Sequence, residues 1–167
     1  NNYKNFENYL NEVRAVRRQE YKKNNDLFDI VEENNTKNLD KLHEKTFLRQ
    51  DIKRNSLEKK IVKRIITKLL NDKIGRLVTI KLKNSNKAIS SSYFLTDNKN
   101  AYNLTLATDP IYRKYSPGTK LLFNQIKNCF SKKINRIDFV GVNSPDRGDY
   151  KLSFNPELKK YFIINYN

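Results

Sequence analysis

The segment Ala101–Gln125, AYNLTLATDPIYRKYSPGTKLLFNQ, contains the change of pattern that decides the fold. Ala101–Ala107 mixes Tyr, Leu and Thr in the way that is typical of a half-buried strand. Asp109-Pro110 ends this strand, because the proline ring removes a backbone donor and disfavours helix for the residue before it. After Gly118, apolar residues recur at helical spacing, at Leu121, Leu122, Ile126, Cys129 and Phe130. The segment therefore predicts a strand, a connector and the start of a helix.

The connector has the composition of a loop that binds a phosphate. It consists of Arg113, Lys114, Tyr115, Ser116, Pro117, Gly118 and Thr119. Its small residues let backbone amides approach a ligand closely, and the free amides of a helix start favour an anion. Arg113 and Lys114 add mobile positive charge. The alternative is a surface loop with ordinary turn chemistry, because glycine-containing turns between strand and helix are common.

Composition sets the class of protein. The 167 residues fit one domain, residues 1–167, with an adequate core, and 37% of them are hydrophobic. No apolar run approaches the roughly 20 residues that span a bilayer, and the first residues lack the apolar core of a signal peptide. With one cysteine, Cys129, on an apolar helix face, we expect a cytoplasmic protein in a reducing compartment. One His and one Cys argue against a zinc site, so we expect no metal.

The net charge of +16 suggests a nucleic acid as partner, but its distribution does not support this strongly. The basic residues are spread along the chain, and only Arg14–Arg18 with Lys22-Lys23 forms a compact cluster. Such a field still favours phosphorylated ligands, among them nucleotides, coenzyme A and tRNA. The chain opens on Asn and contains no Met, so we expect a processed or excised piece, with a further upstream domain as one alternative.

The periodicity predicts an α+β fold. The expected elements are a helix from Phe6 to the Asn24-Asn25 pair that ends it, a strand at Leu27–Glu32, a helix from the capping residues 34–36 through Arg49, a helix from Ser56, strands at Arg76–Lys83, Ala88–Leu95 and Ala101–Ala107, a helix from Gly118 to Phe130, a strand at Ile134–Val142, a loop at 143–149 and a last strand at Leu158–Asn165. Tight polar turns make the three middle strands an antiparallel meander, and the helix after them makes the next strand parallel. A splayed parallel pair at the centre of the mixed sheet forms a ligand slot, with the helix N-terminus pointing into it.

Two helices before the meander carry further expectations. In the helix from Ser56, the residues Leu57, Ile61, Ile65 and Leu69 repeat every four residues, with Val62, Ile66 and Leu70 alongside, so we expect this helix to be buried along one face. In the preceding helix, His43 lies beside the inward stripe. A lone histidine there is more often structural than functional, but a contact with the substrate stays open.

Three motifs in order resemble a known family. They are Tyr115-Ser116-Pro117-Gly118 followed by Leu121-Leu122, then Ile137-Asp138-Phe139-Val140-Gly141, then Tyr150-Lys151 with Phe154. Together with the order of elements, they resemble the GNAT acyltransferase fold over nearly the whole chain. More narrowly, they resemble the branch with the Fem-type aminoacyltransferases of cell-wall synthesis and the acetyltransferases of polysaccharide and amino-sugar pathways. The second motif departs slightly from the family pattern, Asp-Phe-Gly, by an inserted Val.

The resemblance implies a reaction and a donor. The loop at Arg113–Thr119 would bind the pyrophosphate of acetyl-CoA or another acyl-CoA through backbone amides. The strand at Leu104–Ala107, with Leu106 and Ala107, would pair with the pantetheine arm and polarise the thioester. An acceptor amine would then attack the acyl carbon directly, which requires a route for its proton, an oxyanion stabiliser and an acid for the thiolate.

Five polar side chains are candidates for these roles. Asp138 would hold or deprotonate the amine, and Tyr150 would donate a proton to the thiolate. Lys151, Asn143 and His43 are candidates for contact with the acceptor, Lys151 through a phosphate or acidic group. The structural alternatives are a strand-end hydrogen bond for Asp138, an aromatic anchor for Tyr150 and a surface cation for Lys151.

We therefore expect an N-acyltransferase that acts on an amino group, plausibly of an amino sugar or a cell-envelope precursor. One alternative is tRNA-dependent aminoacyl transfer, because Fem-type enzymes use aminoacyl-tRNA. These enzymes usually have two such domains, so a second GNAT-like domain or a homodimer is also open. From another class, the chain could be a basic nucleic-acid-binding module with an inactive GNAT-like core.

Overall fold

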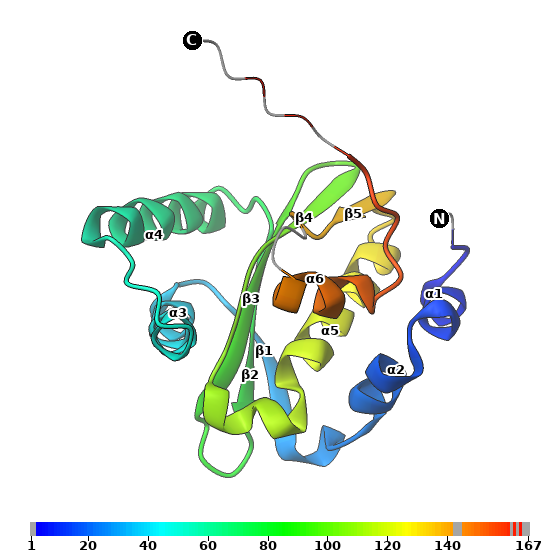
Figure 1. Cartoon of the computed structure of the whole chain (residues 1–167), viewed down its shortest axis with the longest axis horizontal. Coiled ribbons are helices and arrows are strands. Elements are labelled where there is room, and N and C mark those ends of the chain that lie inside the picture. The colour runs from blue at the N-terminus through cyan, green and yellow to red at the C-terminus, as the bar shows by residue number, and fades with distance from the viewer. Residues whose placement is uncertain (1–2, 142–144, 161, 163, 165–167) are drawn as a thin grey trace.

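A computed structural model describes residues 3–141, 145–160, 162 and 164 of the chain (Figure 1). Its elements are α1 (Phe6–Glu12), α2 (Ala15–Lys22), the 3₁₀ helix η1 (Asn25–Leu27), β1 (Phe28–Glu33), α3 (Lys37–Arg49), α4 (Ser56–Asn71), β2 (Arg76–Leu82), β3 (Ala88–Thr96), β4 (Asn100–Thr108), the 3₁₀ helix η2 (Pro110–Tyr115), α5 (Pro117–Ser131), β5 (Arg136–Asp138) and α6 (Pro145–Leu152). No helix in the described ranges is long and apolar enough to cross a membrane.

The sheet has the predicted mixed topology. Its order is β1-β2-β3-β4-β5, with the first four strands antiparallel to their neighbours. β5 joins β4 in parallel, as expected for two strands that a helix connects. The prediction of an antiparallel meander followed by a parallel pair is confirmed.

The helices form one layer on each face of the sheet (Figure 1). α3 and α4 cover one face, where Leu39, Leu42 and Ile66 pack against Leu77 and Tyr93. α1, α2, α5 and α6 lie on the other face, and α5 is central to it, because ten of its 15 residues are buried.

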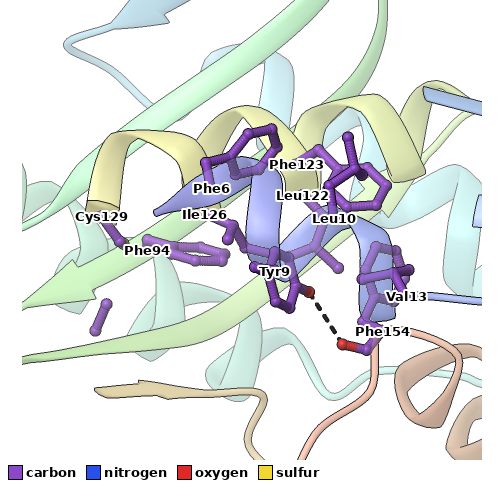
Figure 2. Close-up of a cluster of buried hydrophobic side chains, with 11 residues drawn as sticks. Phe6, Tyr9, Leu10, Val13, Phe94, Leu122, Phe123, Ile126, Cys129 and Phe154 are labelled. Atoms are coloured by element: carbon purple, nitrogen blue, oxygen red, sulfur yellow. Dashed lines mark hydrogen bonds between the residues drawn. The ribbon is translucent and has the colours of Figure 1, made fainter. Parts of the chain in front are cut away.

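Aromatic rings dominate the core between α1 and α5 (Figure 2). The Phe123 ring centroid lies 4.9 Å from that of Tyr21 and 5.1 Å from that of Phe154. The Tyr9 hydroxyl donates to the Phe154 carbonyl at 3.0 Å, which ties the N-terminal helix to the end of α6. Cys129 is buried among these groups, as predicted, and burial raises its thiol pKa to about 11.

The predicted N-terminal helix is instead two helices. Val13 has an extended backbone (φ −73°, ψ 146°), which ends α1. The Arg14 backbone N–H donates to the Ser153 carbonyl at 3.2 Å, and α2 starts in a new direction at Ala15. Because of this bend, α2 lies over the start of α5 rather than continuing along the surface (Figure 1).

The prediction that α4 is buried along one face holds for only part of its apolar set. Val62, Ile66, Leu69 and Leu70 pack toward the sheet, with Ile66 the one buried residue of the helix. The row Leu57, Ile61 and Ile65 was wrongly expected to be covered, since these residues are 61%, 47% and 51% exposed. Asn55 rather than Ser56 is the N-cap, because its side chain accepts from the Leu57 backbone N–H at 2.8 Å.

The chain after α5 also differs from the prediction. β5 has three residues instead of the expected nine, because Asp138 accepts from the Val140 N–H at 2.7 Å and closes a turn. Val140 and Gly141 then adopt left-handed backbone, which ends the strand. A helix, α6, replaces much of the predicted loop at 143–149. The last strand was also expected wrongly, because residues 158–160, 162 and 164 lie outside any helix or strand.

Candidate active site

The two parallel strands lie at one edge of the described sheet, not at its centre as predicted, and they separate after a short contact. β4 and β5 pair at three positions, from Asn100–Arg136 to Tyr102–Asp138. Beyond Tyr102, no described strand pairs with the outer edge of β4. An irregularity opposite Tyr93 and Phe94 also leaves Leu104 as an extra residue on β4. Backbone groups between Asn103 and Ala107 are therefore offered to a ligand in the gap, whereas Thr108 is bonded to the Thr46 hydroxyl of α3 at 3.3 Å.

A buried carboxylate fixes the turn that follows β4. Asp109 is 1% exposed, and its side chain accepts from the Ile111 backbone N–H at 3.2 Å. Its other oxygen accepts from Lys45 of α3 at 2.5 Å. The Asp109-Pro110 pair thus starts η2 and anchors it to the opposite helical layer, which holds the connector in a defined position.

The first turn of α5 packs directly on β4. Ser116 has left-handed backbone (φ 52°), and Pro117 occupies the first turn of the helix, where its missing N–H costs nothing. A Cβ at Gly118 would lie 3.1 Å from the Thr108 hydroxyl and 3.7 Å from the Tyr150 hydroxyl. The glycine is therefore needed for close contact between helix and strand.

The N-terminal helix α2 supplies two side chains to the start of α5. The Thr119 hydroxyl donates to the Glu20 carboxylate at 2.7 Å, and Arg17 donates to the same carboxylate at 2.5 Å. A carboxylate is favourable at this place, because the helix N-terminus carries partial positive charge. Thr119 is 2% exposed. The interior of the predicted phosphate loop is thus occupied by a carboxylate of the chain itself.

Sequence reasoning missed this contribution of α2. In the sequence, Arg17 belongs to the compact basic cluster and was considered only for its charge. A signal was present, since Arg17 lies four residues after the buried Val13 and four before Tyr21, which packs in the core. Arg17 is thus on the inward side of α2.

Tyr150 of α6 lies beside the ion pair of Arg17 and Glu20. Its hydroxyl is 3.4 Å from the Thr119 hydroxyl, and the Arg17 guanidinium lies 4.8 Å above its ring. Burial raises the pKa of Tyr150 to about 12, against smaller opposing effects of Thr119 and Arg17. The phenol therefore keeps its proton at neutral pH. The structure brings Tyr150 next to the predicted loop, although some thirty residues separate Tyr150 from Thr119 in the sequence.

The accessible part of the loop lies on its η2 side. A cavity of about 250 Å³ opens there between α2 and the connector. Its lining residues are Val16, Gln19, Glu20, Lys23, Asn24, Lys114, Tyr115 and Ser116. Two lysines here face one carboxylate, so the cavity has the charge that a phosphate group requires. Arg113 is exposed beside it, and Tyr115 packs against Phe28.

The second predicted motif lies where the sheet splays. Asp138 is half-buried opposite Tyr102, and one of its oxygens accepts from the Val140 backbone N–H. Arg136 lies 3.7 Å from its other oxygen. A hollow of about 1740 Å³ borders this side of the sheet and includes Asp138 in its wall.

Lys151 is bound to the chain's own backbone. Its ammonium group donates to the carbonyls of Phe139, Val140 and Gly141 at 2.7, 2.8 and 2.6 Å. This contact fixes the turn after β5. Its predicted contact with the acceptor stays a prediction, as does that of Asn143, which lies outside the described residues.

His43 lies on the other face of the sheet. Its ring nitrogen bonds to the Thr105 hydroxyl of β4, and the residue is 9% exposed. Burial, helped by the positive charge of Arg54, lowers the pKa of His43 to about 4. It is neutral at pH 7 and lies beside β4 residues next to the gap.

Leu106 and Ala107 of β4 were predicted to contact the donor. The Leu106 side chain faces α5 and the Ala107 side chain faces α3, so the backbone of both residues is what the gap can reach.

These features match a known family. The sequence profile of the acetyltransferase (GNAT) domain matches residues 1–152. The chain belongs to the GNAT acetyltransferase family. It is an N-acyltransferase of the GNAT type, a family whose acetyltransferases use acetyl-CoA. No protein of curated function matches the sequence significantly.

Solved structures show the same GNAT fold. A GNAT acetyltransferase from Staphylococcus aureus Mu50 has a TM-score of 0.64 at 20% identity over 80% of this chain and 87% of its own. Glucosamine-6-phosphate N-acetyltransferase from Arabidopsis thaliana has a TM-score of 0.56 at 15% identity, with coverages of 83% and 97%. Aminoglycoside 6′-N-acetyltransferase from Acinetobacter baumannii has a TM-score of 0.59 at 10% identity, over 84% of this chain and 99% of its own. These matches do not distinguish the Fem-type branch, and tRNA or a second subunit as partner stays a prediction.

Proposed function

We propose that this GNAT enzyme transfers an acetyl group from acetyl-CoA to the amino group of a phosphorylated or nucleotide-linked amino sugar or a related cell-envelope precursor. The observation that carries the proposal is the splay of β4 and β5 after Tyr102, next to the buried start of α5. A thioester arm in this gap would complete the ladder of β4. The acceptor class is supported by the net charge of +16, which attracts anions, and by the glucosamine-6-phosphate N-acetyltransferase that shares the fold.

The pyrophosphate of the donor fits the cavity at Lys114 and Ser116. The Glu20 carboxylate in its wall would repel an anion, but Arg17 is paired with it and neutralises it. Lys23 and Lys114 then leave the cavity with positive charge. In the reaction, the acceptor nitrogen forms a bond to the acyl carbon, the carbon–sulfur bond breaks, and the thiolate takes a proton.

Two side chains suit the proton transfers. Tyr150 is protonated at neutral pH and is proposed to donate to the thiolate. Asp138 lies where the strands separate, and its carboxylate is proposed to hold the ammonium form of the acceptor or take its proton.

The reaction is tested by release of the coenzyme A thiol, followed with a thiol reagent, for glucosamine 6-phosphate, nucleotide-linked amino sugars and unphosphorylated glucosamine. Tyr150→Phe should lower kcat about 100-fold or more, as for loss of a general acid. Tyr112→Phe is the control, since its hydroxyl contacts Lys87 on the surface. Equal activity of the two variants would exclude the assigned role of Tyr150.

Donor binding is tested separately by thermal unfolding with acetyl-CoA. Saturation at about 100 times the dissociation constant adds about 2.7 kcal/mol, a shift of several degrees. Lys114→Glu should remove most of this shift, whereas Lys132→Glu, an exposed charge at the end of α5, should not. The absence of a shift with any acyl-CoA would contradict the proposed donor.

A further inference from the structure

The outward face of α4 is an apolar surface without a described partner. Leu57, Ile61 and Ile65 follow one another at four-residue spacing and are about half or more exposed. Beside them, Lys60, Arg64 and Lys68 repeat at the same spacing and are also exposed. We call these six residues the α4 outer surface. It consists of two parallel rows, one aliphatic and one basic.

The other basic residues of α4 are used within the fold. Lys59 lies 3.9 Å from Glu44, and Lys63 lies 3.2 Å from Asp40, both acidic groups being on α3. Of the outer row, Lys68 pairs with Asp72 at 2.9 Å, an exposed contact that competes weakly with other anions. Within α4 itself Glu58 is the single acidic residue. The outer surface therefore combines exposed aliphatic area with net positive charge.

Charge decides which partner fits. A second copy of this chain would place one basic row against another, in a protein of net charge +16, and such like-charge contacts are costly. A nucleic acid would use the lysines and leave the three aliphatic side chains in water. An anionic bilayer uses both rows, because the aliphatic side chains enter the interface while the cations bind headgroup phosphates.

We propose that α4 docks this protein on an anionic membrane surface, lying in the plane of the interface with Leu57, Ile61 and Ile65 inserted. The helix does not span the bilayer. The interaction does not depend on the proposed acyl transfer, because α4 lies on the sheet face opposite α5 and the cavity at Lys114 (Figure 1).

The test is co-sedimentation of the full chain with vesicles of phosphatidylcholine alone and of equal parts phosphatidylcholine and phosphatidylglycerol. Binding is expected to the mixed vesicles and not to the neutral ones. The variant Lys60→Glu/Arg64→Glu/Lys68→Glu should weaken the partition about 100-fold, since each basic residue near such a surface contributes about a factor of five. Leu57→Ser/Ile61→Ser/Ile65→Ser should weaken it at least about tenfold.

A matched control separates the surface from the overall charge. Lys83→Glu/Lys99→Glu/Lys132→Glu makes the same change of charge at three exposed sites outside α4, and should retain most of the binding. All variants should unfold near the wild-type temperature, because the replaced side chains are exposed. Equal loss in the control, no loss in the α4 variants, or no binding to the mixed vesicles would each overturn the proposal. Binding of a single-stranded RNA through the same row, without vesicle binding, would overturn it as well.

Discussion

Helices α5 and α4 lie on opposite faces of the same sheet and have very different surroundings. α5 has 15 residues and buries ten of them, including the polar Thr119, Lys120 and Gln125. α4 has 16 residues, of which one is buried. Both sequences are amphipathic with helical periodicity. The difference shows that the pattern of a helix identifies its apolar residues, whereas the number of neighbouring elements decides which of them are covered.

The neighbours of each helix explain the contrast. α5 is enclosed by the sheet, by α1 and α2 and by α6, so even the Lys120 ammonium is inside, where it donates to the Tyr21 carbonyl at 2.9 Å. α4 packs on the sheet and pairs with α3 through surface charges. The buried helix starts at the proposed donor site, and the exposed helix offers a surface. Four substitutions or pH changes can break or sharpen this comparison.

The largest effect is expected for Phe123→Ala in α5. The ring is fully buried and contacts Tyr21, Phe6 and Phe154. Its removal should lower the free energy of unfolding by about 3–5 kcal/mol, measured by urea denaturation. A loss below about 1 kcal/mol would show that the α5 face is much less tightly packed than described.

The second-largest change in the free energy of unfolding is expected from the titration of His43 on α3. Its pKa is lowered from 6.5 to about 4, so the unfolded chain takes up the proton first as the pH falls. The contribution of neutral His43 to the free energy of unfolding is fully present above pH 6.5. It is lost as the pH falls from 6.5 to 4, by about 3 kcal/mol in total. His43→Gln should remove this part of the pH dependence. Denaturation series of both proteins at pH 7 and pH 4.5 measure the difference, and parallel curves would contradict the assignment.

A smaller effect is expected where α2 covers α5. Arg17→Ala removes a charged hydrogen bond to Glu20 and the contact over the Tyr150 ring, and leaves the Glu20 carboxylate without its cation. We expect a loss of about 1–3 kcal/mol in the free energy of unfolding. The exposed Lys22→Ala on the same helix should change it by less than about 0.5 kcal/mol. Similar values for both would mean that α2 is held by its apolar contacts alone.

The smallest effect is expected for Ile65 of α4, and the adjacent Ile66 provides the contrast. Ile65 is 51% exposed and Ile66 is 4% exposed. Ile65→Ala should change the free energy of unfolding by less than about 0.5 kcal/mol, whereas Ile66→Ala should cost about 2 kcal/mol or more. Reversed values would mean that the row Leu57, Ile61 and Ile65, and not Ile66, packs against the sheet.

The elements of the central sheet could be predicted because each is determined by local chemistry. Alternation between apolar and polar residues, Asp109-Pro110 and the helical period after Gly118 are all visible in the sequence, and the parallel β4–β5 pair follows from the helix between them. The family resemblance marked Thr119 and Tyr150 as candidate site residues, but the contact between their hydroxyls, at 3.4 Å, was not predicted.

Features that depend on tertiary contacts could not be predicted. The exposed side of α4 is decided by the layers around it, and the Glu20 carboxylate reaches α5 because the chain bends at Val13. α6 starts with Pro145 and contains Gly148, residues that were taken to mark a loop although proline is favourable in a first helical turn. The segment after residue 157 has the composition of a strand, but β strands need a neighbour to pair with, and in the described part none is present.

The splay of β4 and β5 also makes ligand binding visible in the rate of amide hydrogen exchange. Every second backbone N–H between Asn103 and Ala107 points toward the gap, where no described strand accepts it. These amides should exchange quickly although they belong to a long strand of the sheet, next to slow neighbours that are paired with β3. A donor that takes the place of the missing strand should slow them selectively. Mass spectrometry of the peptide that contains β4, with and without acetyl-CoA, would therefore report occupancy of the gap without any knowledge of the acceptor.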